Sequence, residues 1–213
     1  MKKALVVILF VLLAMKFVFS EIGEFQSAPA RRQLRYVEEF YTQYKLTMHY
    51  NTDNLLANIH WLQLGLYARF DHPIRALALI RTPEEHVKYK SLFKMRLHFL
   101  IMKSYLMLGR RYDKENVYYF NREYKRELLT GFEIARIYYT RAEHHWGKVE
   151  SWANEAWKLK HLHLIGSEMD KMQNEMYRIV SKDKWINHKP IIEKLLLKLK
   201  QKEAILQNDT PNN

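Results

Sequence analysis

The chain has 213 residues, of which 48% are hydrophobic and 27% charged, with 5 Trp, 14 Tyr and 10 Phe and a formal net charge of +12. This is the composition of a folded domain, and it excludes disorder as the overall state. The absence of Cys excludes disulfides, thiol catalysis and Cys-ligated zinc, and the 6 Gly form no glycine-rich phosphate-binding motif.

The first twenty residues have the pattern of an export signal. Lys2 and Lys3 precede an apolar stretch from Ala4 to Met15, and Ser20 offers a small residue at a cleavage position. An ordinary buried helix is disfavoured because the stretch shows no polar face. We therefore expect export of the remaining chain to the periplasm, with a linker at residues 21–30.

The same segment could stay in place as a signal anchor. As a helix, residues 4–19 would span roughly 24 Å, whereas a bilayer core is about 30 Å thick. Lys16 could snorkel to the far interface and reduce this shortfall. Residues 1–20 are thus predicted to be either a signal peptide or an anchor in the inner membrane.

Residues 21–213 keep a basic balance, with 32 Lys and Arg against 23 Asp and Glu, a net charge of +9. In an exported protein this balance favours anionic lipid headgroups, an acidic protein partner or an anionic wall polymer, and not nucleic acid. The charge could equally serve only to keep the protein soluble.

The chain after the leader is predicted to be all-α. It contains only five Val, and its apolar residues recur at intervals of three and four. Four helices are expected at residues 34–48, 55–70, 73–80 and 82–108. The next helix is expected to begin at Asp113 or Asn121 and to be interrupted at Gly147, after which a helix continues to about Lys160. Two further helices are expected to begin at Ser167 and at Pro190. Together they form a helical domain over residues 31–206, followed by a disordered polar tail at 207–213.

Local signals set several helix ends. Thr82, Pro83 and Glu85 predict a capping box with proline at the first helical position. Gly109 is predicted to cap the end of the same helix. The predicted core residues of this helix and the next are Leu92, Phe93, Leu97, Leu100, Ile101, Tyr105, Leu128, Phe132, Ala135, Tyr139, Ala142 and Trp146.

Three segments suggest a degenerate repeat of roughly 34 residues. They are Trp61-x-x-Leu64-Gly65, Tyr105-x-x-Leu108-Gly109-x-x-Tyr112 and the Ala/Trp ladder from Ala135 to Trp157. In such repeats a large residue packs across a helical hairpin, and small residues let the two helices approach. The expected fold is a stack of antiparallel helical hairpins with tetratricopeptide-like repeats.

Catalytic and metal signatures are missing. His144 and His145 point to different faces of a helix, and His161-x-His163 does not bring two imidazoles together on one face. Adjacent carboxylates such as Glu38 and Glu39 diverge on a helix, and no nucleophile motif is present. We therefore expect no enzyme activity, no cofactor and no metal.

The arginine and tyrosine residues near the centre of the chain are the candidate partner-binding site. This composition is typical of interaction hot spots, although the aromatic rings could instead belong to the core. The candidate residues are Arg110, Arg111, Tyr112, Tyr119, Arg122 and Tyr124. For Trp146, Trp152 and Trp157 the choice between core packing and a binding groove also stays open.

Residues 60–113, and within them RTPEEHVKYKSLFKMRLHFLIMKSYLMLG, resemble a small group of spirochaete-type exported tetratricopeptide-like proteins. Residues 119–158 look similar as well, so the resemblance covers about half of the chain. That group is linked to the collar of the periplasmic flagellar motor. The resemblance implies an N-terminal membrane segment and a helical periplasmic domain that docks other collar proteins, and it supplies no catalytic residues.

Three functions are consistent with these patterns. The leading expectation is an exported scaffold that mediates protein–protein interactions, with flagellar motor collar components as possible partners. The alternative is a periplasmic ligand-binding accessory of a transporter, in which a basic, aromatic groove holds an anionic or hydrophobic molecule. A wall-active or metal-dependent enzyme that uses the histidines is the third.

Overall fold

The structure is a computed structural model that describes residues 33–47, 52–113, 124–183 and 185–208. Six α-helices and one short 3₁₀ helix form within these ranges. No strand occurs in these ranges; two isolated bridges join Tyr36 to Arg69 and Leu79 to Ile165. The predicted all-α class is thus confirmed. The chain divides into the units Met1–Gln33 and Leu34–Asn213, and the description below concerns the second.

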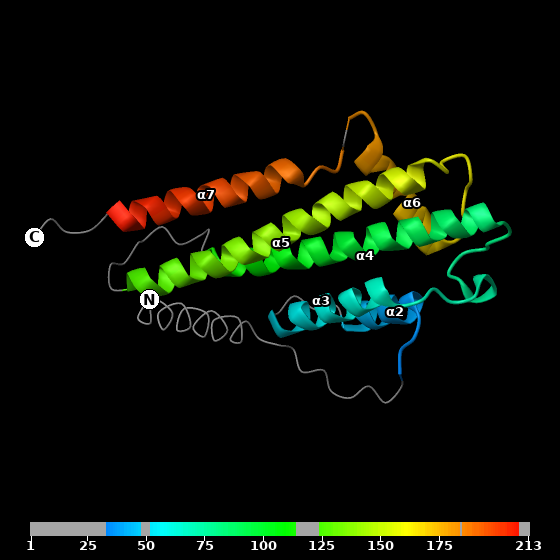
Figure 1. Cartoon of the computed structure of the whole chain (residues 1–213), viewed down its shortest axis with the longest axis horizontal. Coiled ribbons are helices and arrows are strands. Elements are labelled where there is room, and N and C mark those ends of the chain that lie inside the picture. Colours follow the sequence, from blue (N-terminus) through cyan, green and yellow to red (C-terminus); the bar gives the residue numbers. More distant parts are fainter. Residues whose placement is uncertain (1–32, 48–51, 114–123, 184, 209–213) are drawn as a thin grey trace, which may run out of the picture. The chain divides into compact units, whose positions relative to one another are not determined.

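The described part of the chain forms these helices in order. They are α2 (Val37–Thr47), α3 (Thr52–Tyr67), η1 (Pro73–Arg75), α4 (Pro83–Tyr112), α5 (Lys125–Trp157), α6 (Ser167–Val180) and α7 (Lys189–Asn208). The two long helices α4 and α5 lie side by side at the centre (Figure 1). Helix α3 pairs with α2 and packs on α4, whereas α6 packs on both long helices and α7 runs along α5.

The core lies mainly between α4 and α5, where the predicted apolar positions are buried. All six predicted core residues of α4 are at most 6% exposed, and five of the six predicted for α5 are at most 1% exposed. Leu128, the sixth, is half-buried. Ala135 and Ala142 are fully buried, as are the large side chains of Phe93 and Trp146.

The start of α4 follows the predicted capping box. The Thr82 hydroxyl accepts a hydrogen bond from the Glu85 backbone N–H at 3.2 Å, and the Glu85 carboxylate accepts one from the Thr82 backbone N–H at 3.3 Å. Pro83 occupies the first turn. These reciprocal bonds satisfy backbone donors that the helix itself cannot use.

The roles predicted for Gly109 and Gly147 are wrong. Helix α4 continues through Gly109 to Tyr112, and Asp113 caps it through a backbone bond to the Gly109 carbonyl. Helix α5 runs without interruption through Gly147. Gly109 is needed for close helix approach, because a Cβ at this position would lie 2.7 Å from Cδ1 of Tyr139. A Cβ at Gly147 would meet nothing within 4 Å.

Other boundaries differ by a few residues. The predicted helix at 73–80 is only the 3₁₀ turn η1, because Ala76 is already extended and the chain continues to the bridge between Leu79 and Ile165. Helix α5 begins at Lys125 rather than at Asp113 or Asn121. Residues 207 and 208, predicted to be tail, belong to α7.

Several predictions fall outside the described residues, namely the leader at 1–20, the linker at 21–30 and the last five residues of the tail. Within the described part of the chain, no helix combines the length and the apolar character needed to cross a membrane.

The two antiparallel hairpins differ in length. Helices α2 and α3 have 11 and 16 residues, whereas α4 and α5 have 30 and 33. A regular repeat of about 34 residues, which requires two helices per repeat, is therefore not confirmed by this arrangement.

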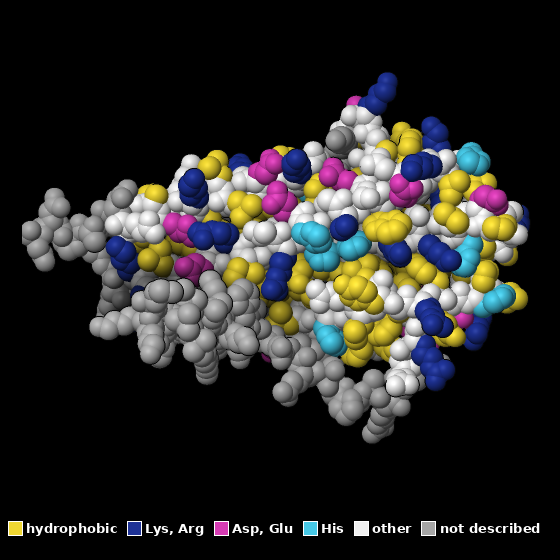
Figure 2. All heavy atoms as spheres, in the orientation of Figure 1, with side chains coloured by type: hydrophobic (Ala, Val, Ile, Leu, Met, Phe, Trp, Pro, Cys, Tyr) yellow, Lys and Arg dark blue, Asp and Glu magenta, His cyan; other side chains and the backbone are white. Residues whose placement is uncertain are grey.

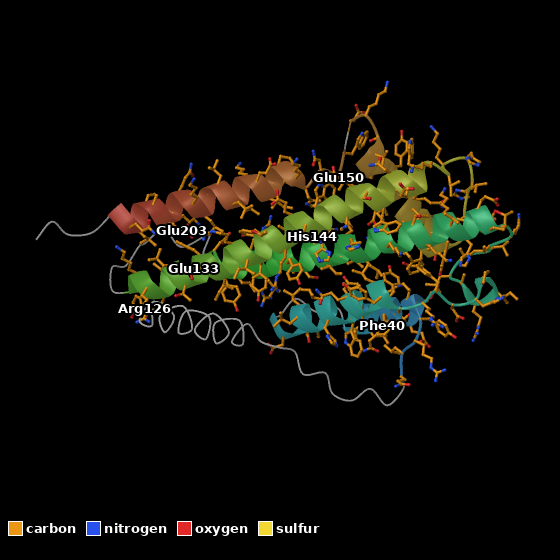
Figure 3. The ribbon with its side chains drawn as sticks, in the orientation of Figure 1. Phe40, Arg126, Glu133, His144, Glu150 and Glu203 are labelled. Atoms are coloured by element: carbon orange, nitrogen blue, oxygen red, sulfur yellow. The ribbon has the colours of Figure 1, made fainter. Side chains whose placement is uncertain are left out.

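Helix α7 is attached to α5 by both apolar and ionic contacts. Ile192 and Leu199 are at most 1% exposed. Glu203, labelled in Figure 3, accepts an ion-pair bond from Arg136 of α5. Lys194, Lys198 and Lys200 are exposed on the opposite side, as an amphipathic helix requires.

Candidate functional site

Helices α2, α3, α4 and α6 enclose a cavity of about 340 Å³, which we call the cationic cleft. Four cations, one carboxylate, two tyrosines and five smaller side chains line it. These residues are Lys45, Arg96, Lys103, Lys171, Glu168, Tyr41, Tyr44, Leu55, Asn58, Leu100, Ser104 and Met107.

The cations of the cleft come from three helices. Arg96 and Lys103 are seven residues apart on α4, which is close to two helical turns, so both side chains lie on the same face. Lys45 stands in the last turn of α2, where a cation also stabilises the helix dipole. Lys171 follows the first turn of α6.

Among the residues that the structure describes, Glu168 is the only carboxylate that lines the cleft, and it contacts three other lining side chains. It accepts hydrogen bonds from Lys45 Nζ at 2.8 Å and from the Tyr41 hydroxyl at 2.9 Å, and Lys171 Nζ lies 3.7 Å away. The bond from Lys45 is the largest cause that lowers the pKa of Glu168. Burial raises the pKa of Tyr41 to about 12, so its phenol remains a donor.

The other cations of the cleft are balanced unequally. Arg96 forms an ion pair with Glu175 of α6. For Lys103 no carboxylate of the described residues lies within ion-pair distance, and its ammonium group lies 4.4 Å from the centroid of the Phe99 ring. The cleft therefore keeps an excess of positive charge among its described lining residues.

The floor of the cleft combines apolar and polar groups. Leu55 and Leu100 are at most 6% exposed, and Asn58 is 1% exposed. The Ser104 hydroxyl donates to the Leu100 carbonyl at 3.0 Å. Ammonium, guanidinium and phenol donors over such a floor can bind a carboxylate or another anion through charge-assisted hydrogen bonds.

Four of the six residues predicted for the Arg/Tyr corner are described by the structure, at the end of α4 and before the start of α5. Arg110 and Arg111 are exposed in the last turn of α4, where cations favour the helix C-terminus. Tyr112 is half-buried, with its ring 5.8 Å from that of Tyr138. Tyr124 is 54% exposed directly before α5. Tyr119 and Arg122 lie outside the described residues.

A second group of functional interest is a histidine cluster on α4 and α5. Nδ1 of His98 lies 2.9 Å from Nδ1 of His145, and His144 is the next ring, 5.6 Å from His145. Imidazole side chains gather over the middle of the face shown in Figure 2, where Figure 3 labels His144. Sequence spacing did not predict this pair, because its members come from different helices.

The histidine pair is neutral at physiological pH. Burial, followed by the neighbouring imidazole, lowers the pKa of His98 to about 3, and burial lowers that of His145 to about 4. The described residues contain no group of three or more His, Asp or Glu side chains suited to hold a metal. Two imidazoles alone fall short of a structural zinc site.

The tryptophans divide between core and surface. Trp146 is 1% exposed and belongs to the core. Trp152 is half-buried, and Lys94 Nζ lies 4.5 Å from the centroid of its ring. Trp157 is also half-buried, and none of the three tryptophans lines the cationic cleft, which lies on α2, α3, α4 and α6.

A model of the family described as a domain of unknown function (DUF8513) matches residues 84–208. The matched range begins in the first turn of α4 and ends with α7, so it contains α4 to α7 without the α2–α3 hairpin. Neither a curated protein nor a solved structure matches the chain.

Proposed function

The chain belongs to the DUF8513 family, and we propose that this member is a helical scaffold that binds a protein partner through the cationic cleft. The observation that carries the proposal is the convergence of four cations from three helices around one carboxylate. Such an excess of positive charge at a concave site attracts acidic groups and accelerates their association.

The expected partner element is a short acidic segment. A cavity of about 340 Å³ accommodates a few side chains and not a folded domain. Lys103 is the first candidate for contact, because it has no carboxylate partner among the described residues, and Lys171 lies on the opposite wall with a longer ion-pair distance of 3.7 Å. Tyr41 and Tyr44 add apolar contact area with polar tips.

We propose that the scaffold works in the periplasm, exported by residues 1–20 and held at the inner membrane if these residues are not cleaved. The resemblance of residues 60–113 makes components of the flagellar motor collar the first partners to test. The antiparallel pairs α2–α3 and α4–α5 support a description of the scaffold as a degenerate tetratricopeptide-like stack.

Charge reversal tests the proposal. The double variant Lys103→Glu/Lys171→Glu changes the cleft, and Lys194→Glu/Lys200→Glu changes the net charge equally at exposed positions of α7. Crosslinking in the native cell, followed by identification of the crosslinked proteins, should give collar components with the unaltered protein and with the α7 variant. The cleft variant should lose them.

A defined probe complements the crosslinking experiment. A peptide of six glutamates should bind the full-length protein, weaken steeply with added salt and lose affinity only in the cleft variant. Equal crosslinking and equal peptide binding by both double variants would refute the cleft as the binding site.

The ligand-binding accessory is the second proposed function, and the size of the same cleft favours it. Ligand sites occupy roughly 300–1,000 Å³, a range that includes this cavity. Native mass spectrometry distinguishes the two functions: a co-purified small anion that the cleft variant loses supports the accessory, and a stable complex with a protein supports the scaffold.

A further inference from the structure

A second cavity, of about 350 Å³, lies between α4, α6 and the segment that joins α5 to α6. We call it the Lys88 cavity. Lys88, Gln173 and Met176 are buried residues of its lining, and Trp157 and Tyr177 contribute aromatic rings. It shares no lining residue with the cationic cleft, and all of its lining residues lie within the range that the family matches.

The buried lysine is the unusual feature of this cavity. Lys88 is only 2% exposed, and its ammonium group donates a hydrogen bond to the Leu162 carbonyl, which belongs to the same lining. No carboxylate of the described residues lies within ion-pair distance of it. An ammonium group has three donors, so one carbonyl leaves most of its bonding capacity unused.

Such a group is costly to bury without a counter-charge. Burial accordingly lowers the pKa of Lys88. The neighbouring polar side chain does not compensate, because the Gln173 amide is bonded to both the N–H and the carbonyl of Leu164, at 3.1 and 3.0 Å. An anion that enters the cavity would supply the missing partner.

The walls of the cavity indicate which anion fits. The rings of Trp157 and Tyr177 have centroids 5.9 Å apart, and Met176 adds an apolar surface. Lys160 at the rim lies over the Trp157 ring at 4.8 Å, and Asp170 at the rim is 3.5 Å from His163. One buried cation beside aromatic walls matches one negative charge on an apolar body, and not a dianion such as phosphate.

We propose that the Lys88 cavity binds a small aromatic or aliphatic monocarboxylate, with the carboxylate on the Lys88 ammonium group and the hydrocarbon part against Trp157 and Tyr177. This site is independent of the proposed scaffold function. It assigns Lys88 a role in ligand binding in addition to its bond with the Leu162 carbonyl.

Calorimetric titration of the full-length protein tests this proposal with three probes. 3-Phenylpropionate is the carboxylate, 3-phenylpropan-1-ol is its uncharged analogue, and inorganic phosphate is an anion without an apolar body. The variants are Lys88→Gln, which keeps a donor for the Leu162 carbonyl, and Lys88→Met, which removes it. We expect phenylpropionate to bind the unaltered protein and to bind both variants at least about tenfold more weakly, as loss of a charge-assisted hydrogen bond predicts.

Thermal unfolding provides the second measurement. Phenylpropionate should raise the Tm of the unaltered protein and not that of Lys88→Met. If the Lys88 variants do not fold, Tyr177→Ala provides the test instead, because Tyr177 is an exposed residue of the cavity wall. This variant should bind phenylpropionate about threefold more weakly. Lys103→Glu/Lys171→Glu should bind phenylpropionate as the unaltered protein does, which separates this site from the cationic cleft.

Four results would contradict the proposed monocarboxylate site. Absence of phenylpropionate binding, equal affinity of the Lys88 variants, or equal affinity of the alcohol would overturn the proposal and leave Lys88 as a structural link between α4 and the α5–α6 segment. Binding of phosphate in preference to phenylpropionate would contradict the ligand class.

Discussion

Gly109 of α4 lies directly against the ring of Tyr139 of α5, so that a Cβ at position 109 would come within 2.7 Å of Cδ1 of the ring. The Tyr139 hydroxyl also donates to the Asp113 carboxylate, and Asp113 caps α4. The close approach of α4 and α5 and the capping of α4 therefore both depend on Gly109 and Tyr139.

Gly109→Ala should destabilise the protein. The added methyl group must displace a ring that is itself 0% exposed and hydrogen-bonded. Overpacking of this kind costs about 1–3 kcal/mol, more than the gain in helix propensity of about 1 kcal/mol. Urea denaturation followed by circular dichroism measures the difference, and a variant as stable as the unaltered protein would contradict the close-approach argument.

Gly147→Ala should have the opposite effect. Gly147 is exposed inside α5, and a Cβ there meets nothing within 4 Å. Alanine should therefore stabilise the protein by about 0.5–1 kcal/mol through helix propensity alone. The same denaturation experiment gives the sign, and a loss of stability would mean that α5 is not continuous at this position.

The comparison of the two glycines explains what could be predicted from the sequence. Local signals were sufficient for the capping box of Thr82 and for the buried stripe of α4, because these depend on residues within one helix. The role of a glycine depends on what packs against it, and for Gly109 that is a residue thirty positions away. The expected cap and the expected interruption were wrong for this reason.

The candidate sites required the fold in the same way. The cationic cleft takes Lys45, Arg96 and Lys171 from three helices, and only the pair Arg96 and Lys103 has a spacing that sequence can recognise. Lys88 follows Val87 and precedes Tyr89 in a helix with many charged residues, and nothing in that pattern indicates that its side chain is buried.

Thr82→Ala should remove the capping box of α4. Alanine removes the hydroxyl that accepts from the Glu85 backbone N–H and keeps the backbone N–H that donates to the Glu85 carboxylate. We expect the loss of the hydroxyl bond to cost about 1 kcal/mol. Thr130→Ala is the matched control, because Thr130 is exposed inside α5 and bonds only to the Arg126 carbonyl of its own helix. If the two alanine variants unfold at the same urea concentration, the cap does not contribute to stability.

The histidine pair predicts a loss of stability in mild acid. His98 and His145 have pKa values lowered to about 3 and about 4, whereas an unfolded histidine titrates near 6.5. The unfolded chain therefore binds more protons between these limits. The contribution of the neutral pair to the free energy of unfolding is fully present above about pH 6.5. It decreases as the pH falls toward the lowered pKa values of the folded protein.

His98→Gln should flatten this dependence. We expect the free energy of unfolding of the unaltered protein to fall by at least about 1 kcal/mol between pH 7 and pH 5, and that of the variant to fall less. His161→Gln, at an exposed position, should keep the full dependence. Lys94, Lys148 and His144 also disfavour protonation of His98, so these groups must be left intact in the comparison.

Tyr89 connects α4 to two other parts of the fold. Its hydroxyl donates to Glu38 of α2 at 2.8 Å and accepts from the backbone N–H of Leu77 at 3.2 Å. The second Glu38 oxygen accepts from the Asp71 backbone N–H at 3.2 Å. Tyr89 is 0% and Glu38 6% exposed, so water cannot replace these bonds readily.

Tyr89→Phe should therefore destabilise the protein by about 1–3 kcal/mol, the cost of leaving a buried polar group unsatisfied. The carboxylate of Glu38 loses a donor and the N–H of Leu77 loses its acceptor, while the packing of the ring is kept. Tyr177→Phe is the control, because that side chain is 56% exposed. Urea denaturation of both variants at pH 7 measures the two losses of unfolding free energy. If the Tyr89 hydroxyl couples α2 and the segment before α4 to α4 itself, Tyr89→Phe loses more stability than Tyr177→Phe, and equal losses would contradict this coupling.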